Sequence, residues 1–573
     1  MRDRVKKSKQ KQRDIVSWSG FFWCTIFVVF SCVLFTGFTF STFRLLFGET
    51  FQPVLVVRWR APARESIISG EAPVTPSISI RETVLLPDQA IIFLNYPPSA
   101  RLFTKEDLDC VYFSANSSQL RFNQPPVDVN GEDRDNQIVR CPLQPRGFTV
   151  SLALKSNGEN ITAGPTHRWD SLVYEAMIDR DNTTIVFVKG LNLRPEKVGD
   201  TSRYECVYGW NFTRPRYLLR SDVVSIAQEI VRCKTPLSVL SSPRRMGNSV
   251  KVSVRVKGRG IFGSIARAGL RSVPPDPPTR KEHEMCVCTM FRNQARFLKE
   301  WVIYHAKIGV QRFFIYDNNS DDNIDNVLEW LSNGNYNISY HVWPWIKTQE
   351  AGFAHCAIRA RDSCEWVGFI DVDEFFYLPS NLVLHDVLQN QSRYSYVGEI
   401  RASCHSFGPS GLKRVPQQGV TTGYTCRMAV AERHKSIVRP EALNSTLINV
   451  VHHFHLRDGF EYVNVDKGVM VINHYKYQVW EVFKEKFYRR VATYVADWQN
   501  DQNVGSKDRA PGLGTRPVEP PHWSSRFCEV RDTGLRDQVL RILANPKTQI
   551  LPWQEEDGKY KRRTTKRMHR RIL

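Results

Sequence analysis

The second half of the sequence lacks the glycine-rich loops that bind the phosphates of common nucleotide cofactors. Neither G-x-G-x-x-G nor G-x-x-x-x-G-K-[ST] follows any strand predicted there. In those motifs the glycines let backbone amides approach the phosphates closely. Their absence argues against a dinucleotide enzyme and against P-loop chemistry.

A second absence is charge: no charged side chain occurs between Ile15 and Phe43, where most residues are apolar. About 20 such residues suffice for a helix to cross the hydrocarbon core of a membrane. A cleaved signal peptide is the alternative, but its apolar region usually spans only about 7 to 15 residues. Seven Lys and Arg precede the stretch in residues 1–14, whereas Arg44 alone follows it closely. The positive-inside rule then predicts a single-pass type II membrane protein, with a cytosolic tail at 1–14, a signal anchor at 15–43 and a luminal remainder.

Acidic residues are missing from the C-terminal end, where Lys559 to Leu573 contains eight Lys and Arg. Together with residues 1–14 this end carries most of the net charge of +21, so the body of the chain is only mildly basic. Basic tails bind nucleic acid or anionic membranes, but a solvated tail is the alternative, and a luminal location disfavours nucleic acid. We therefore expect no nucleic-acid partner and assign residues 546–573 to a basic C-terminal tail.

The chain has 13 cysteines, most of them beyond the predicted anchor, and this distribution permits disulfides in an oxidising compartment. Sequons of the form N-x-S/T cluster in the first luminal half and agree with that location. The predicted glycosylation sites there are Asn116, Asn160, Asn182 and Asn211.

The pattern changes twice between the anchor and the middle of the chain. Residues 44–85 contain scattered Pro and Ser without sustained periodicity and are predicted to form a stem. Residues 86–271 contain short apolar runs separated by turn residues, which is typical of an all-β sandwich. A Pro-rich, charged linker at 272–284 then marks the clearest domain boundary.

Four cysteines fall inside the predicted β-rich domain: Cys110, Cys141, Cys206 and Cys233. They predict two disulfides, and the sequence leaves three pairings open. Metal ligation is the alternative, but no C-x-x-C pair supports it. The aromatic residues of the domain either pack in its core or stack on sugar rings, so carbohydrate binding is one of two interpretations. These residues are Trp169, Tyr204, Tyr208 and Trp210.

Strand and helix patterns alternate from residue 285 to residue 545. The predicted strands begin at Met285, Gln311, Tyr336 and Trp366, with helical patterns between them. This alternation predicts parallel βαβ units in an α/β fold, and the uninterrupted apolar strands predict burial on both faces of the sheet. Cys286 and Cys288, in the first strand, are expected to be buried thiols.

Two of these strands end in polar loops. Asp371 and Asp373 follow the fourth strand, and Asp317 and Asn319 follow the second. The ligand crevice of an open α/β sheet lies beyond the carboxyl ends of its strands, so both loops are expected at one site. Two carboxylates one residue apart suit a hard divalent cation that also binds phosphates. Asp317 and Asn319 can hydrogen-bond a nucleoside, whereas residues 317–322 could equally be a capping loop for the following helix. We favour a double role, and the combination predicts a site for a nucleotide sugar.

Several segments resemble glycosyltransferase family 92 and follow the family's order. They are CVCTMFRN (286–293), EWVIYH (300–305), IGV (308–310), YDNNS (316–320), FIDVDEF (369–375), KSIVRP (435–440), HHFH (452–455) and NHY (473–475). The resemblance covers roughly residues 284 to 545 and implies a GT-A fold with a Rossmann-like mixed sheet, an inverting mechanism, a UDP-sugar donor and Mn²⁺.

The family resemblance also implies a location and partners. Plant members are Golgi galactosyltransferases that extend pectic β-1,4-galactan, and they carry a similar β-rich, carbohydrate-binding-like domain before the catalytic one. The expected partners are a UDP-sugar donor, a glycan acceptor of the cell wall and the membrane, and a homodimer is left open.

The resemblance also suggests residue roles. Asp373 and Asp371 are the expected metal ligands, and His474 is either a third ligand or a structural histidine. The donor is expected to contact Arg292, Asn293, Asp317, Asn319, Asp371 and Lys435, although surface roles for the cations are the alternative.

Inversion requires a general base near the acceptor hydroxyl. The unranked candidates are Glu374, Glu399, Asp458 and Glu461. His452, His453 and His455 either line the acceptor groove or are half-buried strand residues.

Two other functions compete with a transferase. A phosphatase of the haloacid dehalogenase type also uses D-x-D after a strand, but Phe375 stands where such enzymes usually have a small or β-branched residue. A lectin-like luminal protein that binds carbohydrate through its β-rich domain is the second alternative.

Overall fold

The computed structural model describes residues 78–554 apart from several gaps, and this part lies in one compact unit, residues 68–573. The gaps are residues 98–99, 115–120, 132–136, 192, 195–196, 213–214, 216, 242–249, 270–279, 381, 451 and 495–518. The predicted tail at 1–14, the anchor at 15–43 and most of the stem therefore lie outside the described residues. Within the described part, no helix has both the length and the apolar character needed to cross a membrane.

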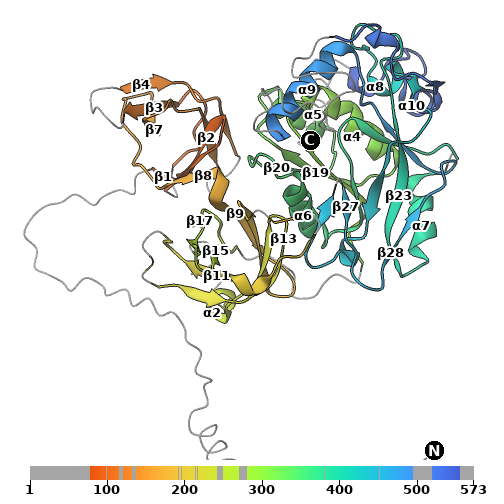
Figure 1. The fold of residues 1–573 in the computed structure, drawn as a ribbon. Helices are drawn as coiled ribbons and strands as arrows, with labels where there is room; N and C mark the ends of the chain where they lie inside the picture. The colour runs from red at the N-terminus through yellow and green to blue at the C-terminus, as the bar shows by residue number, and fades with distance from the viewer. Residues whose placement is uncertain are drawn as a thin grey trace, which may run out of the picture. The chain divides into compact units, whose positions relative to one another are not determined.

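The first β-rich domain is a sandwich of a five-stranded and a three-stranded sheet (Figure 1, orange). The strand orders are β5-β6-β2-β1-β8 and β4-β3-β7. The strands are β1 (Ser79–Leu85), β2 (Gln89–Asn95), β3 (Leu108–Ser114), β4 (Arg121–Gln124), β5 (Asp128–Asn130), β6 (Ile138–Pro142), β7 (Phe148–Leu154) and β8 (Thr166–Arg168). A disulfide between Cys110 and Cys141 joins β3 to β6 and so ties the two sheets together.

The second β-rich domain is a separate sandwich, whereas a single one is predicted from the sequence (Figure 1, yellow). Its sheets have the orders β13-β14-β10-β9-β17 and β12-β11-β15-β16, and Cys206–Cys233 joins β11 to β14. The strands are β9 (Leu172–Ile178), β10 (Thr183–Lys189), β11 (Tyr204–Gly209), β12 (Leu219–Ser221), β13 (Val223–Ala227), β14 (Ile230–Lys234), β15 (Lys251–Val256), β16 (Gly260–Ile261) and β17 (Gly263–Ser264); the short helix α2 (Leu237–Ser241) follows β14.

Three predicted boundaries need correction. β1 lies in the predicted stem but pairs with β2 and β8, so the sandwich begins by residue 79. The predicted linker at 272–284 extends too far, because β18 already begins at His283. Leu551, in the predicted basic tail, is fully buried in the core of the α/β domain, because its segment folds back onto that domain.

The α/β half begins at β18, and we call it the catalytic half after the prediction from the sequence. It contains a nine-stranded mixed sheet of order β20-β19-β18-β21-β25-β23-β29-β22, with β28 paired to β23. Its first part alternates as predicted: β18 (His283–Phe291), α4 (Ala295–Ile308), β19 (Arg312–Asp317), α5 (Ile324–Asn333), β20 (Ile338–Val342), α6 (Gln349–Ala360) and β21 (Cys364–Phe369). These four strands are parallel, and β25 joins β21 in the antiparallel sense.

The remaining elements complete the sheet and cover it. They are β22 (Glu374–Tyr377), α7 (Leu384–Ser392), β23 (Val397–Ser406), α8 (Val420–Gly423), β24 (Cys426–Arg427), β25 (Arg433–Val438), β26 (Asn449–Val450), β27 (His453–Phe454), β28 (Glu461–Asn464), β29 (Val471–His474), α9 (Trp480–Tyr494), β30 (Val530–Arg531) and α10 (Gly534–Leu543).

Both faces of β18, β19 and β21 are buried, and each face belongs to a different core, whereas the edge strand β20 is only half-buried. Phe313 and Ile315 of β19 point into a core shared with α4 and α10, whereas Phe314 and Tyr316 point into a core shared with α6. The second core also contains residues of both sandwiches, among them Phe93 and Phe187. One face of the catalytic sheet is therefore covered partly by the β-rich domains. We call this second core the shared core.

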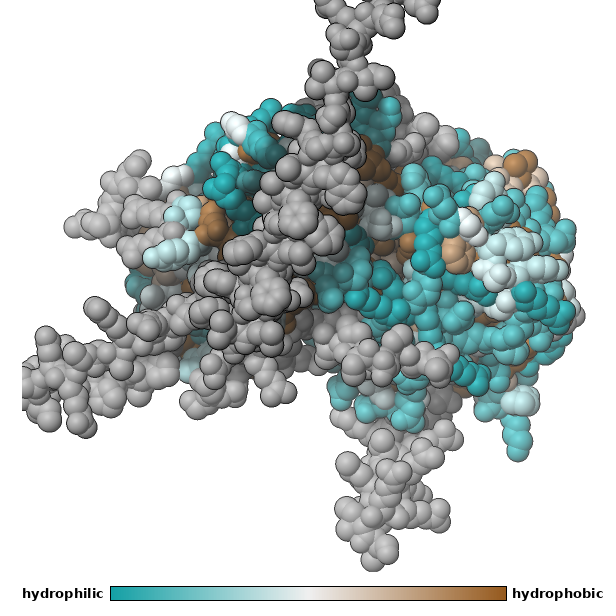
Figure 2. Space-filling model, turned by 90° about the horizontal axis from the view of Figure 1, so that it is seen from below, coloured by the Kyte–Doolittle hydropathy of each residue, from teal (hydrophilic) through white to brown (hydrophobic). Residues whose placement is uncertain are grey.

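Further disulfides hold the catalytic half. Cys286 and Cys288 are not free thiols as predicted, because they are bonded to Cys364 and Cys356. Cys426 is bonded to Cys528, and the described free cysteine is the buried Cys404. On the face seen in Figure 2 the described surface is mainly hydrophilic, and hydrophobic side chains occur there in small groups.

Candidate active site

The D-x-D segment lies at the turn between β21 and β22. β21 ends at Phe369, and the backbone amide of Asp371 donates a hydrogen bond of 3.0 Å to Oε2 of Glu374, which fixes the turn. β18 lies between β19 and β21, and all three strands are parallel. The loop after Asp317 and the D-x-D turn therefore open on the same edge of the sheet, which confirms the predicted juxtaposition.

Asp373 is the more buried of the two aspartates, with a side chain that is 3 % exposed. Lys486 of α9 forms an ion pair with Oδ2 of Asp373, and Nε2 of His474 lies 3.6 Å from the same oxygen. Burial opposes ionisation, but Lys486 and His474 hold the pKa of Asp373 well below its usual value. Asp373 is therefore an ionised carboxylate that lies between the nitrogen atoms of Lys486 and His474.

Asp371 is more accessible and faces a different set of groups. Nζ of Lys435 lies 3.7 Å from Oδ2 of Asp371, and Nε2 of His452 lies 3.6 Å from it. Despite burial, the charge of Lys435 lowers the pKa of Asp371. Burial lowers the pKa of His452 to about 3, so its imidazole is neutral.

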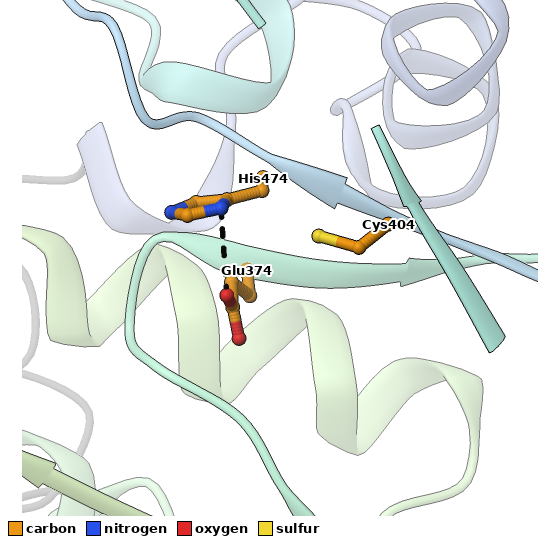
Figure 3. A group of neighbouring side chains, drawn as sticks. All are labelled: Glu374, Cys404 and His474. Carbon is orange, nitrogen blue, oxygen red and sulfur yellow. Dashed lines mark ion pairs between the residues drawn. The ribbon is translucent and has the colours of Figure 1, made fainter. Parts of the chain in front are cut away.

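Glu374, Cys404 and His474 meet where β22, β23 and β29 adjoin (Figure 3). Their nearest ligand atoms lie within 4.8 Å of one another, and Nδ1 of His474 is 3.5 Å from Oε1 of Glu374. Burial raises the pKa of the Cys404 thiol well above its usual value, and a protonated thiol is a poor ligand for a hard cation. The three side chains therefore do not form a thiolate metal site, and the role of Glu374 is to orient the ring of His474.

Asp373 and His474 have the donor chemistry of a site for a divalent metal ion such as Mn²⁺, with Oδ2 and Nε2 3.6 Å apart, whereas Asp371 faces Lys435 and His452, and neither aspartate belongs to the group of three ligand atoms within 4.8 Å found in the described residues. Nε2 of His474 is buried and has no hydrogen-bond partner among the described residues, while Nδ1 faces Glu374. A carboxylate behind a ligating histidine fixes the orientation of the ring, and carboxylate with imidazole suits such an ion. Binding requires Lys486 to move away from Asp373.

The loop after β19, residues 317–322, is held by its own polar groups, and we call it the β19 loop. Asp317 is 2 % exposed and accepts hydrogen bonds from the Tyr340 hydroxyl (2.8 Å) and from the Ser320 amide (3.1 Å). Asn319 donates to the carbonyl of Pro344 (2.9 Å) and is equally buried. Both predicted donor residues therefore shape the loop, and the capping interpretation is wrong for Asp317 because its carboxylate bonds within the loop and to β20.

The next two predicted donor residues, Arg292 and Asn293, flank this loop. Oδ1 of Asn293 accepts a hydrogen bond from the Asp321 amide (2.6 Å). The guanidinium of Arg292 lies 3.8 Å from Asp321 and 3.7 Å from Asp88 of the first sandwich.

The four candidates for the general base lie in different places. Glu461 pairs with Val397 at the start of β23, whereas His474 pairs with Ser406 at the end of the same strand. At 3.3 Å per residue, the two ends of β23 are about 30 Å apart, so Glu461 lies far from His474. Asp458 precedes β28 near Glu461 and is exposed. Neither fits the predicted role, because the acceptor must react beside the D-x-D turn.

The two buried candidates already have fixed partners. Glu399 binds Arg401 at 2.9 Å and also Ser436 and His453, and these hydrogen bonds, against its burial, lower its pKa to about 2. Glu374 is fully buried and binds Lys435 at 2.8 Å. Burial raises the pKa of Glu374. Both carboxylates therefore serve to hold neighbouring side chains in place.

The three predicted acceptor histidines do not form one group. His452 lies beside Asp371, at a positive φ of 73°. His453 contacts Glu399 at 3.2 Å and the carbonyl of His434 at 3.1 Å, which is the structural role given as the alternative. His455 is exposed.

Sequence reasoning misses Lys486, which contacts Asp373. Residues 479–498 show an amphipathic pattern of aromatic residues, and only packing follows from that pattern. The available signal is that Lys486 lies three residues after the buried Phe483, on the same face of the helix.

Comparison with known proteins identifies the family. The sequence profile of glycosyltransferase family 92 matches residues 281–506. A family 92 protein of Ricinus communis is 67 % identical over 95 % of this chain and 99 % of its own length. The chain belongs to glycosyltransferase family 92. Family 92 proteins of Oryza sativa and Arabidopsis thaliana are 51 % and 45 % identical over 92 % and 89 % of the chain, covering 93 % and 90 % of their own lengths.

Solved structures of other glycosyltransferases resemble this family 92 protein only weakly. A mannosyltransferase of Pyrobaculum calidifontis in complex with GDP-Man and Mn²⁺ matches with a TM-score of 0.24 and 14 % identity, over 40 % of this chain and 66 % of its own. GalNAc-T7 with UDP, GalNAc and Mn²⁺ matches with a TM-score of 0.23 and 11 % identity, over 34 % and 44 %. Because these scores are low, the enzyme class rests on family membership.

Proposed function

We propose that this glycosyltransferase is a Golgi type II membrane enzyme that transfers a hexose, with inversion, from a UDP-sugar to a cell-wall glycan. Galactose is the proposed sugar, and β-1,4-galactan is the proposed acceptor. The observation that carries the proposal is the contact of Asp373 with His474, with Asp371 on the same turn, at the edge of the sheet onto which the β19 loop also opens. The phosphatase alternative is dropped because the chain belongs to family 92.

The chemistry follows from what each side chain can do. Mn²⁺, when bound, would offset the negative charge that develops on the departing UDP. Asp371, Asp373 and His474 would hold the ion. Lys435 and Lys486 are cations that can attract the diphosphate directly. In the transfer the acceptor oxygen bonds to the anomeric carbon, the bond from that carbon to the phosphate oxygen breaks, and a base takes the hydroxyl proton.

The second sandwich supports a carbohydrate-binding role for the β-rich half. It contains a cavity of about 600 Å³ lined by Tyr204, Phe262, Arg203 and Arg259, among others. The lectin-like alternative would use this cavity alone. Of the other predicted aromatic residues, Trp169 and Tyr208 are buried in cores, whereas Trp210 is 39 % exposed.

The test is a panel of UDP-sugars and glycan acceptors, assayed with the full chain in detergent, with Mn²⁺ or with EDTA. We expect galactosyl transfer that requires the metal, and a loss on the order of 100-fold or more in Asp373→Asn. The matched control is Asp458→Asn, an exposed aspartate away from the site, which should keep wild-type activity. Transfer of another sugar only would refute the galactosyl assignment, and full biological function in Asp373→Asn would favour the lectin.

A further inference from the structure

The β19 loop is fixed from the side of the β-rich domains. Nδ2 of Asn318 donates hydrogen bonds to the carbonyls of Trp343 (2.8 Å) and Trp345 (3.0 Å). The ring of Trp345 in turn stacks on Phe93 of the first sandwich (ring centroids 6.0 Å apart) and packs on Tyr174 of the second (5.2 Å). The segment that supports the loop is therefore packed against both sandwiches.

A buried arginine of the first sandwich reaches the loop directly. Arg140, on β6, is 1 % exposed, and its Nη2 donates hydrogen bonds to the carbonyl of Ser320 and to Oδ1 of Asp321, both at 2.9 Å. The same nitrogen lies 3.2 Å from Oδ2 of Asp128 on the neighbouring strand β5. One guanidinium thus joins the sandwich to the backbone and to a side chain of the loop.

Arg140 makes fewer hydrogen bonds than a buried guanidinium needs if its only role is to stabilise the fold. Its Nε and Nη1 are buried and have no hydrogen-bond partner among the described residues. Burying a cation is costly, and the two carboxylates that would lose their partner in Arg140→Met, those of Asp128 and Asp321, are 32 % and 42 % exposed, so water can hydrate them. We therefore expect Arg140→Met to fold, so that an effect on the position of the loop can be measured apart from an effect on stability.

We propose that Arg140 is a positioning residue for the sugar donor: it holds the β19 loop in the shape that receives the nucleoside, so that the first sandwich completes the donor site. This inference rests on the proposed function, because it assumes that the β19 loop contacts the donor. The charge of Arg140 also acts on the loop electrostatically: burial raises the pKa of Asp317, and the positive charge of Arg140 opposes this rise.

The experiment compares the full-length wild type with Arg140→Met in two assays. Steady-state kinetics should show a KM for the UDP-sugar raised about tenfold, with kcat and the acceptor KM within about twofold, because the loop binds the donor without reacting. Hydrogen–deuterium exchange without ligand should show faster exchange in residues 317–322. Arg140→Lys keeps the charge but not the planar group, and its donor KM and loop exchange rate should lie between those of the wild type and Arg140→Met.

The matched control is Arg180→Met. Arg180 also crosses from a sandwich to the catalytic half, where it binds Asp362 and Glu441, away from the β19 loop. It should change neither the donor KM nor exchange in the loop. Unchanged loop exchange in Arg140→Met, or an equal rise of KM in Arg180→Met, would overturn the inference. A wild type that uses no UDP-sugar would instead refute the proposed function, while loop exchange and the affinity for UDP, measured by calorimetry, would still decide the role of Arg140.

Discussion

Lys486 stands in a position that a metal ion would compete for. Its ammonium group pairs with Asp373, which is almost fully buried. Removing one partner of a buried ion pair leaves an uncompensated charge and costs about 3 to 5 kcal/mol. A divalent cation bound to Asp373 would supply the missing positive charge.

For Lys486→Met we therefore expect a lower melting temperature than the wild type in EDTA, and a larger rise of that temperature when Mn²⁺ is added. Binding to the folded state alone stabilises it by mass action, and the variant gains a site that Lys486 no longer occupies. Differential scanning fluorimetry measures both values. Lys484→Met, an exposed lysine of the same helix, is the control, and equal Mn²⁺ shifts in wild type and Lys486→Met would contradict the expectation.

The residues of the site could be predicted where a sequence motif indicates both the chemistry of the side chains and their position in the fold. A D-x-D segment after an apolar strand predicts Asp371 and Asp373 at the sheet edge, and the structure places them there. Lys486 arrives from a helix more than 100 positions later, so only the tertiary packing brings it to Asp373. For the same reason the sequence could not show that Glu399 is held by Arg401, Ser436 and His453.

At the scale of elements, a buried carboxylate links α4 to α8. Glu300 is 4 % exposed and accepts hydrogen bonds from the amides of Val420 (2.8 Å) and Thr421 (2.9 Å). Gly419 precedes them at φ 104°, and a side chain there would collide with the Glu300 carboxylate. Burial raises the pKa of Glu300 from 4.5 to about 7, although these hydrogen bonds oppose the rise.

This pKa predicts a pH dependence of stability. Below about pH 4.5 Glu300 is protonated in both states and contributes nothing; between about 4.5 and 7 it ionises in the unfolded state only. Stability therefore falls as the pH rises through this interval, by about 3 kcal/mol. Between pH 5 and pH 8 the melting temperature of Glu300→Gln should therefore fall less than that of the wild type. The exposed control Glu106→Gln should show the same fall as the wild type. An identical pH profile for Glu300→Gln and wild type would contradict the assignment.

The alternating elements of the catalytic half were predictable because each strand and helix is long and strongly periodic. The division of the β-rich half was not. β1 pairs with β8, some 80 positions later, and β9 then starts a new sheet almost at once. Short strands with turn residues look alike in either sandwich, so only their pairing shows where one domain ends.

At the scale of the whole molecule, the shared core makes the sandwiches part of the catalytic fold. Trp343 and Trp345 pack on Tyr174, Trp169 and Phe187. A catalytic fragment without the sandwiches would expose both tryptophans to water, and exposed apolar patches of this kind promote aggregation.

We therefore expect fragment 280–573 to aggregate and fragment 68–573 to remain monomeric, as measured by size-exclusion chromatography with light scattering. The longer fragment should unfold in one transition, because its parts share buried side chains. A short fragment that is monomeric, with the melting temperature of the longer one, would show that the sandwiches fold separately.

The shared core also has a consequence for biosynthesis. About 160 residues separate Phe187 from Trp345, which corresponds to roughly 10 to 30 s of translation at the usual speed of a ribosome. During that interval the sandwiches have emerged but their apolar face has nothing to cover it. The nascent chain is thus exposed to misassociation midway through its synthesis, and chaperones that recognise apolar segments would act on it at that stage.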